Sequence, residues 1–279
     1  MHGVKTWLVV NSASGGNEED RLKRLVAALE EQGVAPDQVI DVIAGKCPDA
    51  AMLDGAGVGL LAIFAGDGTI NSVLLGIEGW CGKVLVLPGG TANLLARALH
   101  GERDECAIVA ALSDLATVRR KAVRCEHGVA LIELLAGPGA KWSDVRESLR
   151  DRDLAEMVAG GIDAVQQSVS GPDVAIVDPA LGDAQGYAGI RMSPQDDAFK
   201  VAGYGAQSFS ELVRQGMALL RRDYREGPHD DLGQVREIVC ESRGGEPIEL
   251  MIDGERQTGA ARVRFSLVEV RVDLLAARA

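Results

Sequence analysis

The chain is 279 residues long and 47% hydrophobic, which is enough for one large globular domain or two medium ones. Its formal net charge of −12 argues against nucleic acid as a partner, because phosphate backbones bind basic surfaces. The same charge argues against broad electrostatic attachment to anionic lipid. No apolar run approaches the roughly 18 residues that a membrane span needs, so we expect no transmembrane segment and at most peripheral membrane contact.

The cysteines and histidines indicate neither a disulfide framework nor a zinc site. Five cysteines form no C-x-x-C pair, and the four histidines are scattered along the chain. This usage suits a reducing compartment, and we therefore expect a cytoplasmic protein.

The first 120 residues repeat one pattern three times: an apolar strand, a Gly-rich polar loop and a helix. The predicted strands are residues 7–10, 60–65 and 84–87. Continuously apolar strands that alternate with helices are typical of a parallel sheet covered on both faces. The sequence therefore predicts an α/β nucleotide-binding domain over residues 1–120.

From about residue 118 the pattern changes to short strands separated by turn residues. The predicted strands are residues 174–177, 190–192, 199–203, 235–240, 248–252 and 263–272. Helices are predicted within residues 142–169 and over residues 210–222. Residues 121–279 are therefore predicted to form a second, β-rich domain, and it stays open whether the last residues pack back on the first domain.

The loop after the second predicted strand carries the clearest chemical signal, Gly66-Asp67-Gly68-Thr69-Ile70-Asn71. The two glycines lack a Cβ atom, so backbone N–H groups there can approach a phosphate closely. The Asp67 carboxylate could bind Mg²⁺ or accept a proton from an attacking hydroxyl. Thr69 and Asn71 offer further donors to phosphate oxygens.

Each of these features has an alternative interpretation. Gly-Asp-Gly alone is also typical of a tight turn, but Ser14-Gly15-Gly16 and Pro88-Gly89-Gly90-Thr91 occupy matching places and together favour phosphate binding. Asn93 fits equally an N-cap of the helix that starts at Leu94. The chain has no G-x-x-x-x-G-K-[ST] loop, and the Gly-rich residues 55–59 have the wrong spacing for a dinucleotide fingerprint and are interpreted as a loop.

In combination, these motifs resemble the diacylglycerol kinase catalytic-domain family, which includes bacterial lipid kinases, sphingosine kinases and ceramide kinases. The resemblance implies an NAD-kinase-like N-terminal α/β nucleotide-binding domain, a C-terminal β-sandwich-like domain and an active site in the cleft between them. The residues that carry it are Gly66-Asp67-Gly68-Thr69 with Asn71, Pro88-x-Gly90-Thr91-x-Asn93-x-x-Ala96-Arg97, Asn11-x-x-Ser14-Gly15 and Asp253-Gly254-Glu255.

The resemblance also implies roles for individual residues. Asp67 or Asp253 would be the general base toward the acceptor hydroxyl, and Asp197 would help to hold a structural Mg²⁺. By its own pattern, Asp253-Gly254 after an apolar run also predicts a two-residue hairpin turn. The residues expected to bind ATP are Asn11, Ser14, Gly15, Gly66, Gly68, Thr69, Asn71, Gly90, Thr91, Asn93 and Glu255.

The leading hypothesis is an ATP- and Mg²⁺-dependent lipid kinase that phosphorylates a hydroxyl of diacylglycerol, a sphingoid base or a ceramide at a membrane surface. Two alternatives stay open: a kinase of a soluble acceptor such as NAD, and a non-catalytic nucleotide- or lipid-binding protein of the same fold. A homodimer is also left open by the sequence.

Overall fold

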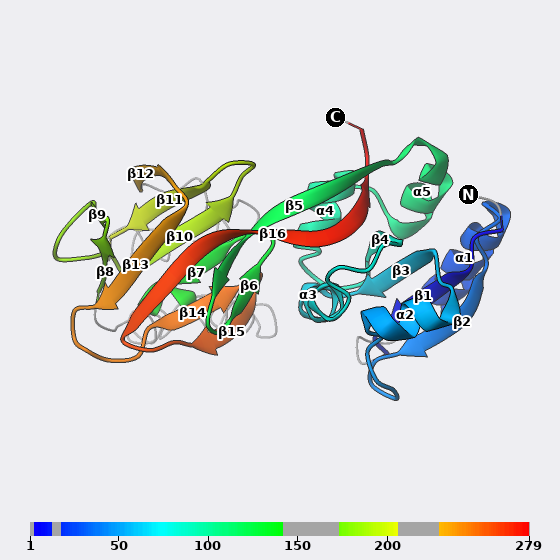
Figure 1. The fold of residues 1–279 in the computed structure, drawn as a ribbon, viewed down its shortest axis with the longest axis horizontal. Helices are drawn as coiled ribbons and strands as arrows, with labels where there is room; N and C mark the ends of the chain where they lie inside the picture. The colour runs from blue at the N-terminus through cyan, green and yellow to red at the C-terminus, as the bar shows by residue number, and fades with distance from the viewer. Residues whose placement is uncertain (1–2, 13–17, 142–172, 206–228, 279) are drawn as a thin grey trace, which may run out of the picture. The chain divides into compact units, whose positions relative to one another are not determined.

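The computed structural model describes residues 3–12, 18–141, 173–205 and 229–278 (Figure 1). The chain divides into two compact units, and each is described by itself. Unit 1 consists of residues 1–120 and 269–279, and unit 2 consists of residues 121–268. The helices predicted within 142–169 and over 210–222 lie outside the described residues, as do Ser14 and Gly15.

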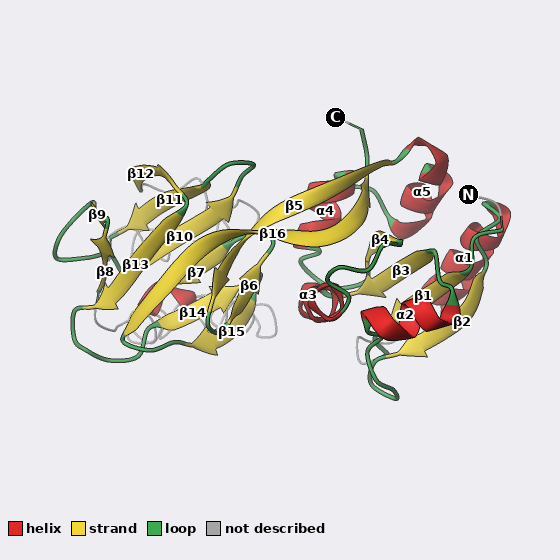
Figure 2. Ribbon diagram, in the orientation of Figure 1, coloured by secondary structure: helices red, strands yellow, loops and turns green. Residues whose placement is uncertain are grey.

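Unit 1 is a parallel sheet with helices packed on it (Figure 2). The strand order is β2-β1-β3-β4-β16, and β16 joins the sheet in parallel through Asp273 and Leu274. The strands are β1 (Thr6–Val10), β2 (Pro36–Asp41), β3 (Leu60–Ala65), β4 (Lys83–Pro88) and the end of β16 (Arg262–Ala276). The helices are α1 (Glu18–Glu31), α2 (Ala50–Ala56), α3 (Asp67–Gly76), α4 (Leu94–His100) and α5 (Glu105–Ala110), followed by a 3-10 turn at Leu112–Asp114.

The apolar pattern of unit 1 explains this arrangement. Every residue of β1 and β3 is buried, as a parallel sheet covered on both faces requires. On one face, Leu25 and Leu29 of α1 and Ile108 of α5 share a core cluster with alternate strand residues such as Leu8. The predicted parallel α/β fold of this unit is confirmed.

Two local predictions in unit 1 were wrong. The sequence predicted three strands before residue 90, but β2 is a fourth, paired in parallel with β1 at the edge of the sheet. Only Ile40 of β2 is buried, so an edge strand of this kind carries no continuous apolar run. The Gly-rich residues interpreted as a loop begin inside α2, which contains Gly55 and ends at a left-handed Gly57 C-cap.

Unit 2 is a β-sandwich. One sheet has the order β12-β11-β10-β7-β14-β15, and the other contains the first part of β16 next to β13, β8 and β9, with β5 and β6 also paired to it. The two sheets share one core cluster that includes Phe199, Leu250 and Phe265. Its elements are β5 (Ala116–Cys125), β6 (Gly128–Ala130), β7 (Leu134–Ala136), a 3-10 turn (Pro138–Lys141), β8 (Val174–Asp178), β9 (Ala180–Leu181), β10 (Gly189–Pro194), β11 (Phe199–Tyr204), β12 (Asp230–Val235), β13 (Glu237–Ser242), β14 (Glu249–Ile252) and β15 (Glu255–Thr258).

The β-rich character of this half is therefore confirmed, with one difference in detail. The strand predicted over 235–240 is the end of β12 and the start of β13, separated by Arg236. No helix within the described ranges is both long and apolar enough to cross a bilayer.

The buried histidine of α4 makes the stability of unit 1 depend on pH. His100 is only 3% exposed, and burial lowers its pKa to about 4, with the charge of Arg103 acting in the same direction. In the unfolded chain its pKa returns to about 6.5, so the unfolded state binds more protons between these values. The free energy of unfolding should therefore fall by about 1–3 kcal/mol as the pH drops from about 6.5 to 4.

Denaturant unfolding across this pH range, comparing wild type with His100→Leu, measures the effect. The variant should lose this part of the pH dependence, whereas His127→Gln, in the β5–β6 turn, should keep it. Equal pH dependence in wild type and His100→Leu would contradict the assignment.

Candidate nucleotide-binding site

The sheet of unit 1 has a topological switch point between β1 and β3. The connection from β1 leads to β2 on one side, and the next strand in the chain, β3, pairs with β1 on its other side. Ligands of open α/β sheets bind at the carboxyl ends of the strands at such a point. Here the Asn11 side-chain amide, directly after β1, donates a hydrogen bond of 2.9 Å to the Thr69 hydroxyl oxygen in the first turn of α3.

The loops after β3 and β4 also meet, backbone against backbone. A Cβ atom built on Gly90 would lie 2.6 Å from the Cα of Gly66, and one built on Gly89 would lie 2.5 Å from the backbone nitrogen of Ala65. Real Cβ atoms essentially never come so close, so these two positions require glycine for close approach. The loops after β3 and β4 are therefore in direct backbone contact.

Side chains lock the two loops together. Asp67, from the loop after β3, accepts a hydrogen bond of 3.2 Å from the backbone N–H of Leu95 in the first turn of α4. Asn93 occupies the N-cap position of α4, but its side chain makes no cap hydrogen bond. Instead its amide pairs with both backbone groups of Gly90, each at 2.8 Å. Asn93 therefore takes the predicted N-cap position, but the side-chain acceptor for the first turn of this helix is Asp67.

The environment of Asp67 distinguishes it from an ordinary surface carboxylate. Burial raises the pKa of its carboxyl above the usual range, and backbone N–H groups of Leu94, Leu95 and Asn93 partly offset the effect. Asp67 is nevertheless only half-buried, so a ligand can reach its carboxylate. The N-cap residue of α3 is Gly66, so no side chain of this residue caps the helix. The backbone N–H groups at this helix N-terminus therefore suit an anion.

The remaining residues expected at the nucleotide have varied places. Gly68 and Asn71 lie in α3, and Thr91 is exposed in the turn that follows β4. Asn11, Gly66, Gly68, Thr69, Asn71, Gly90, Thr91 and Asn93 thus all lie at or beside the carboxyl ends of β1, β3 and β4 in unit 1. Their contact with a nucleotide stays a prediction.

Asp253 lies in unit 2, in the two-residue turn between β14 and β15. The turn has positive φ at both Asp253 (48°) and Gly254 (92°), as a two-residue hairpin of this kind requires. The Asp253 carboxylate is buried and accepts hydrogen bonds of 2.7–2.9 Å from the backbone N–H groups of Leu131, Ile132 and Glu133. It therefore holds the segment between β6 and β7 in place.

The other two predicted residues of unit 2 are exposed. Glu255 follows this turn as the first residue of β15, and Asp197 lies in the connection between β10 and β11. Within the described ranges, no group of three or more His, Cys, Asp or Glu side chains could hold a metal ion. A structural Mg²⁺ at Asp197 thus gains no support from its described surroundings.

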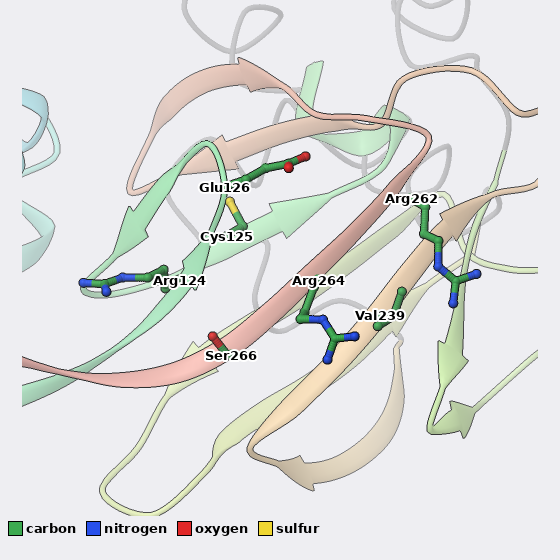
Figure 3. Close-up of a pocket in the computed structure, with 7 residues that line it drawn as sticks. All are labelled: Arg124, Cys125, Glu126, Val239, Arg262, Arg264 and Ser266. Atoms are coloured by element: carbon green, nitrogen blue, oxygen red, sulfur yellow. The ribbon is translucent and has the colours of Figure 1, made fainter.

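A groove of about 490 Å³ lies elsewhere in unit 2, on the sheet of β5, β13 and β16 (Figure 3). Its lining includes Arg124, Arg262 and Arg264, and Figure 3 shows the Arg124 side chain pointing away from the other two. Arg262 and Arg264 are paired with Glu241 and Glu237. The arginines do not converge on one anion, and none of the predicted site residues lines this groove.

The sequence interpretation missed two residues that support the loops. Arg21 of α1 donates to both carboxylate oxygens of Glu105 of α5 and to the carbonyl oxygen of Pro88. The two ion-pair partners are 84 positions apart, so no local motif could reveal them.

Comparison with known proteins points to a kinase domain in the part of the chain that forms these loops. Residues 5–125 match the family model of the diacylglycerol kinase catalytic domain. This part of the chain is therefore similar to that kinase domain, and the matched range contains β1, β3, β4 and all three of their loops. No curated protein matches the chain significantly in sequence.

Solved structures show the same fold over nearly the whole chain. A crystal structure of a diacylglycerol kinase from Bacillus anthracis str. Sterne has a TM-score of 0.61 at 15% identity, covering 98% of this chain and 96% of that one. Yeast NADH kinase complexed with NADH has a TM-score of 0.54 at 11% identity, covering 99% of this chain and 84% of that one. The predicted fold, NAD-kinase-like with a β-sandwich, is confirmed.

The contact between the loops can be tested by adding a Cβ atom at Gly90. Gly90→Ala should force the loops after β3 and β4 apart, lower the free energy of unfolding by about 1–3 kcal/mol and weaken nucleotide binding. Gly55→Ala is the matched control, because its Cβ would meet nothing within 4 Å and it lies in α2. Thermal unfolding and nucleotide titration of both variants measure the difference; equal behaviour would contradict a tight contact.

The hydrogen bonds of Asp253 predict a structural effect in unit 2. In Asp253→Asn, the amide NH₂ group replaces one acceptor oxygen and faces a backbone N–H donor. We expect a loss of about 1–3 kcal/mol in the free energy of unfolding, with faster amide exchange at residues 131–133. Exposed Glu255→Gln, two residues away, should be neutral in both measurements. Unchanged exchange in Asp253→Asn would refute the anchoring role.

Proposed function

We propose that this protein is an ATP-dependent lipid kinase that transfers the γ-phosphoryl group of ATP to a hydroxyl of a lipid such as diacylglycerol, a sphingoid base or a ceramide. One observation carries the proposal. The interlocked loops after β3 and β4 lie at the carboxyl edge of a parallel sheet, within the residues that match the diacylglycerol kinase catalytic domain.

The chemistry asked of such a site is mainly positioning and charge neutralisation. The uncapped N-terminus of α3 and the Gly66 and Gly90 backbones suit the phosphates of a nucleotide, with Thr69 and Asn11 already held together beside them. Mg²⁺ bound with the nucleotide would neutralise phosphate charge.

We assign the general base to Asp67 in preference to Asp253. Both carboxylates accept backbone hydrogen bonds, but Asp253 is buried in its turn at 5% exposure, which leaves it poorly placed to meet an acceptor hydroxyl. The Asp67 carboxyl is more accessible and has a raised pKa, and a raised pKa makes a carboxylate a stronger proton acceptor. Glu255 stays a proposed nucleotide contact from unit 2.

A soluble acceptor is the second candidate, because the chain shares its fold with an NADH kinase. That likeness rests on 11% identity and concerns the fold alone, whereas the family match concerns the diacylglycerol kinase catalytic domain. A lipid acceptor therefore has the stronger support. Because a lipid acceptor lies in a membrane, we propose that the protein makes peripheral contact with a membrane surface.

Transfer of labelled phosphate from ATP tests the proposal directly. Purified protein with Mg²⁺ should phosphorylate at least one lipid of a panel containing diacylglycerol, sphingosine and ceramide, and it should leave NAD and NADH unmodified. Transfer to NAD or NADH but to no lipid would favour the second candidate. ATP binding with no transfer to any acceptor would make the protein a non-catalytic binder.

The role of Asp67 is tested by Asp67→Asn, which should lower kcat by about 10²–10⁴-fold while ATP binding changes little. Because the raised pKa means that protonation of Asp67 begins at higher pH than for a free aspartate, the acid limb of wild-type kcat/KM should lie above about pH 4. Asp54→Asn, at an exposed position in α2, serves as the control. An active Asp67→Asn enzyme would exclude Asp67 as the base.

A further inference from the structure

Arg21 contacts the ends of both strands that lead into the interlocked loops, β3 and β4. It lies in the first turns of α1, the helix that follows the loop after β1. Its guanidinium carbon lies 4.9 Å from the ring centroid of Phe64, two residues before Gly66. Its Nη2 donates a hydrogen bond of 2.9 Å to the carbonyl oxygen of Pro88, the last residue of β4.

The Pro88 carbonyl needs a partner from outside the sheet. In the peptide that joins Pro88 to Gly89, the N–H of Gly89 donates to Ala65 of β3 at 3.2 Å. Because a trans peptide is planar, the carbonyl of the same unit points the opposite way, away from β3. On that side β16 pairs with β4 only at Lys83 and Val84, so it does not reach Pro88.

A partly buried ion pair fixes the orientation of Arg21. Its Nε and Nη2 donate to the two carboxylate oxygens of Glu105 at 3.0 and 2.8 Å. The Glu105 side chain is only 7% exposed. Burial opposes its ionisation, but the hydrogen bond and charge of Arg21 outweigh this and lower the pKa of Glu105, so the pair is charged at neutral pH. A bidentate pair of this kind constrains both the direction and the distance of the guanidinium.

We propose that Arg21 is a positioning residue for the nucleotide: by holding the Pro88 carbonyl, it keeps the Gly89-Gly90-Thr91 turn against Gly66 in the geometry that binds phosphates. Gly89 and Gly90 pack closely against the backbone of the loop after β3, so even a small displacement of the turn would disturb this contact. Loss of the Pro88 hydrogen bond would let the turn move, and a misplacement of about 1 Å can weaken a binding geometry greatly. Glu105 acts through Arg21. This assignment rests on the proposed nucleotide-binding function.

The test compares Arg21→Lys and Glu105→Gln with Lys23→Ala. Lysine keeps the positive charge but cannot reproduce the fork that reaches both Glu105 and Pro88. Lys23 lies on the same helix and, among the described residues, forms exposed ion pairs with Glu19 and Asp20, so its loss is the matched control. Amide hydrogen exchange at residues 89–93 and the Kd for ATP, measured by calorimetry, are the readouts.

In both Arg21→Lys and Glu105→Gln, amide exchange at residues 89–93 should speed up by roughly tenfold or more. The Kd for ATP should rise by about tenfold and the KM for the acceptor should stay unchanged. Lys23→Ala should match wild type in all three. A lower melting temperature with unchanged exchange at 89–93 and unchanged ATP affinity would reduce Arg21 to a structural ion pair and overturn the proposal.

Two further outcomes are informative. If Arg21→Lys weakens ATP binding while Glu105→Gln does not, Arg21 contacts the nucleotide directly and the positioning role is wrong. If wild type itself binds no ATP, the proposed function fails, and the exchange at residues 89–93 still decides whether Arg21 holds this turn.

Discussion

The backbone contact between Gly66 and Gly90 is the constraint on which the candidate site depends. Because Gly90 has no Cβ atom, the loops after β3 and β4 approach more closely than any other residue at this position would allow, whereas a Cβ atom on Gly66 would make only an ordinary contact at 3.7 Å. At that separation Asp67 reaches the N-terminus of α4. The parallel pairing of β3 with β4 extends to Ala65 and Pro88, so the sheet itself delivers both loops to this contact.

Asp67 and Asp253 both match motifs of the same kinase family, but their surroundings give the two carboxylates different accessibility and hydrogen bonding. Asp67 lies at the start of a helix in a half-buried position, where burial raises the pKa of its carboxyl. Asp253 lies in a turn with positive φ, and three consecutive backbone N–H groups surround its carboxylate. A carboxylate committed in this way is suited to holding a loop, whereas a partly desolvated and reachable one is suited to proton transfer.

Much of the fold could be predicted because its central strands are continuously apolar. β1 and β3 are buried throughout and β4 is buried from Val84 to Leu87, so all three are visible as apolar runs. β2 buries only Ile40 and was missed for that reason. The glycines of the candidate site were also predictable, since a Gly-rich turn after an apolar strand is a local pattern. The support of Pro88 by Arg21 and Glu105 was not, because these contacts join residues far apart in sequence.

The sequence by itself determined the alternation of strands and helices, the glycine turns that follow β3 and β4, and the resemblance to a kinase family. These are properties of neighbouring residues, and short-range patterns are sufficient to reveal them. Only the tertiary structure decided that Asp67 caps α4 from the neighbouring loop, and that Asp253 anchors residues 131–133. The physical reason is that a hydrogen bond is assigned by distance in space, and the competing donors for each carboxylate or amide come from segments that the sequence keeps apart.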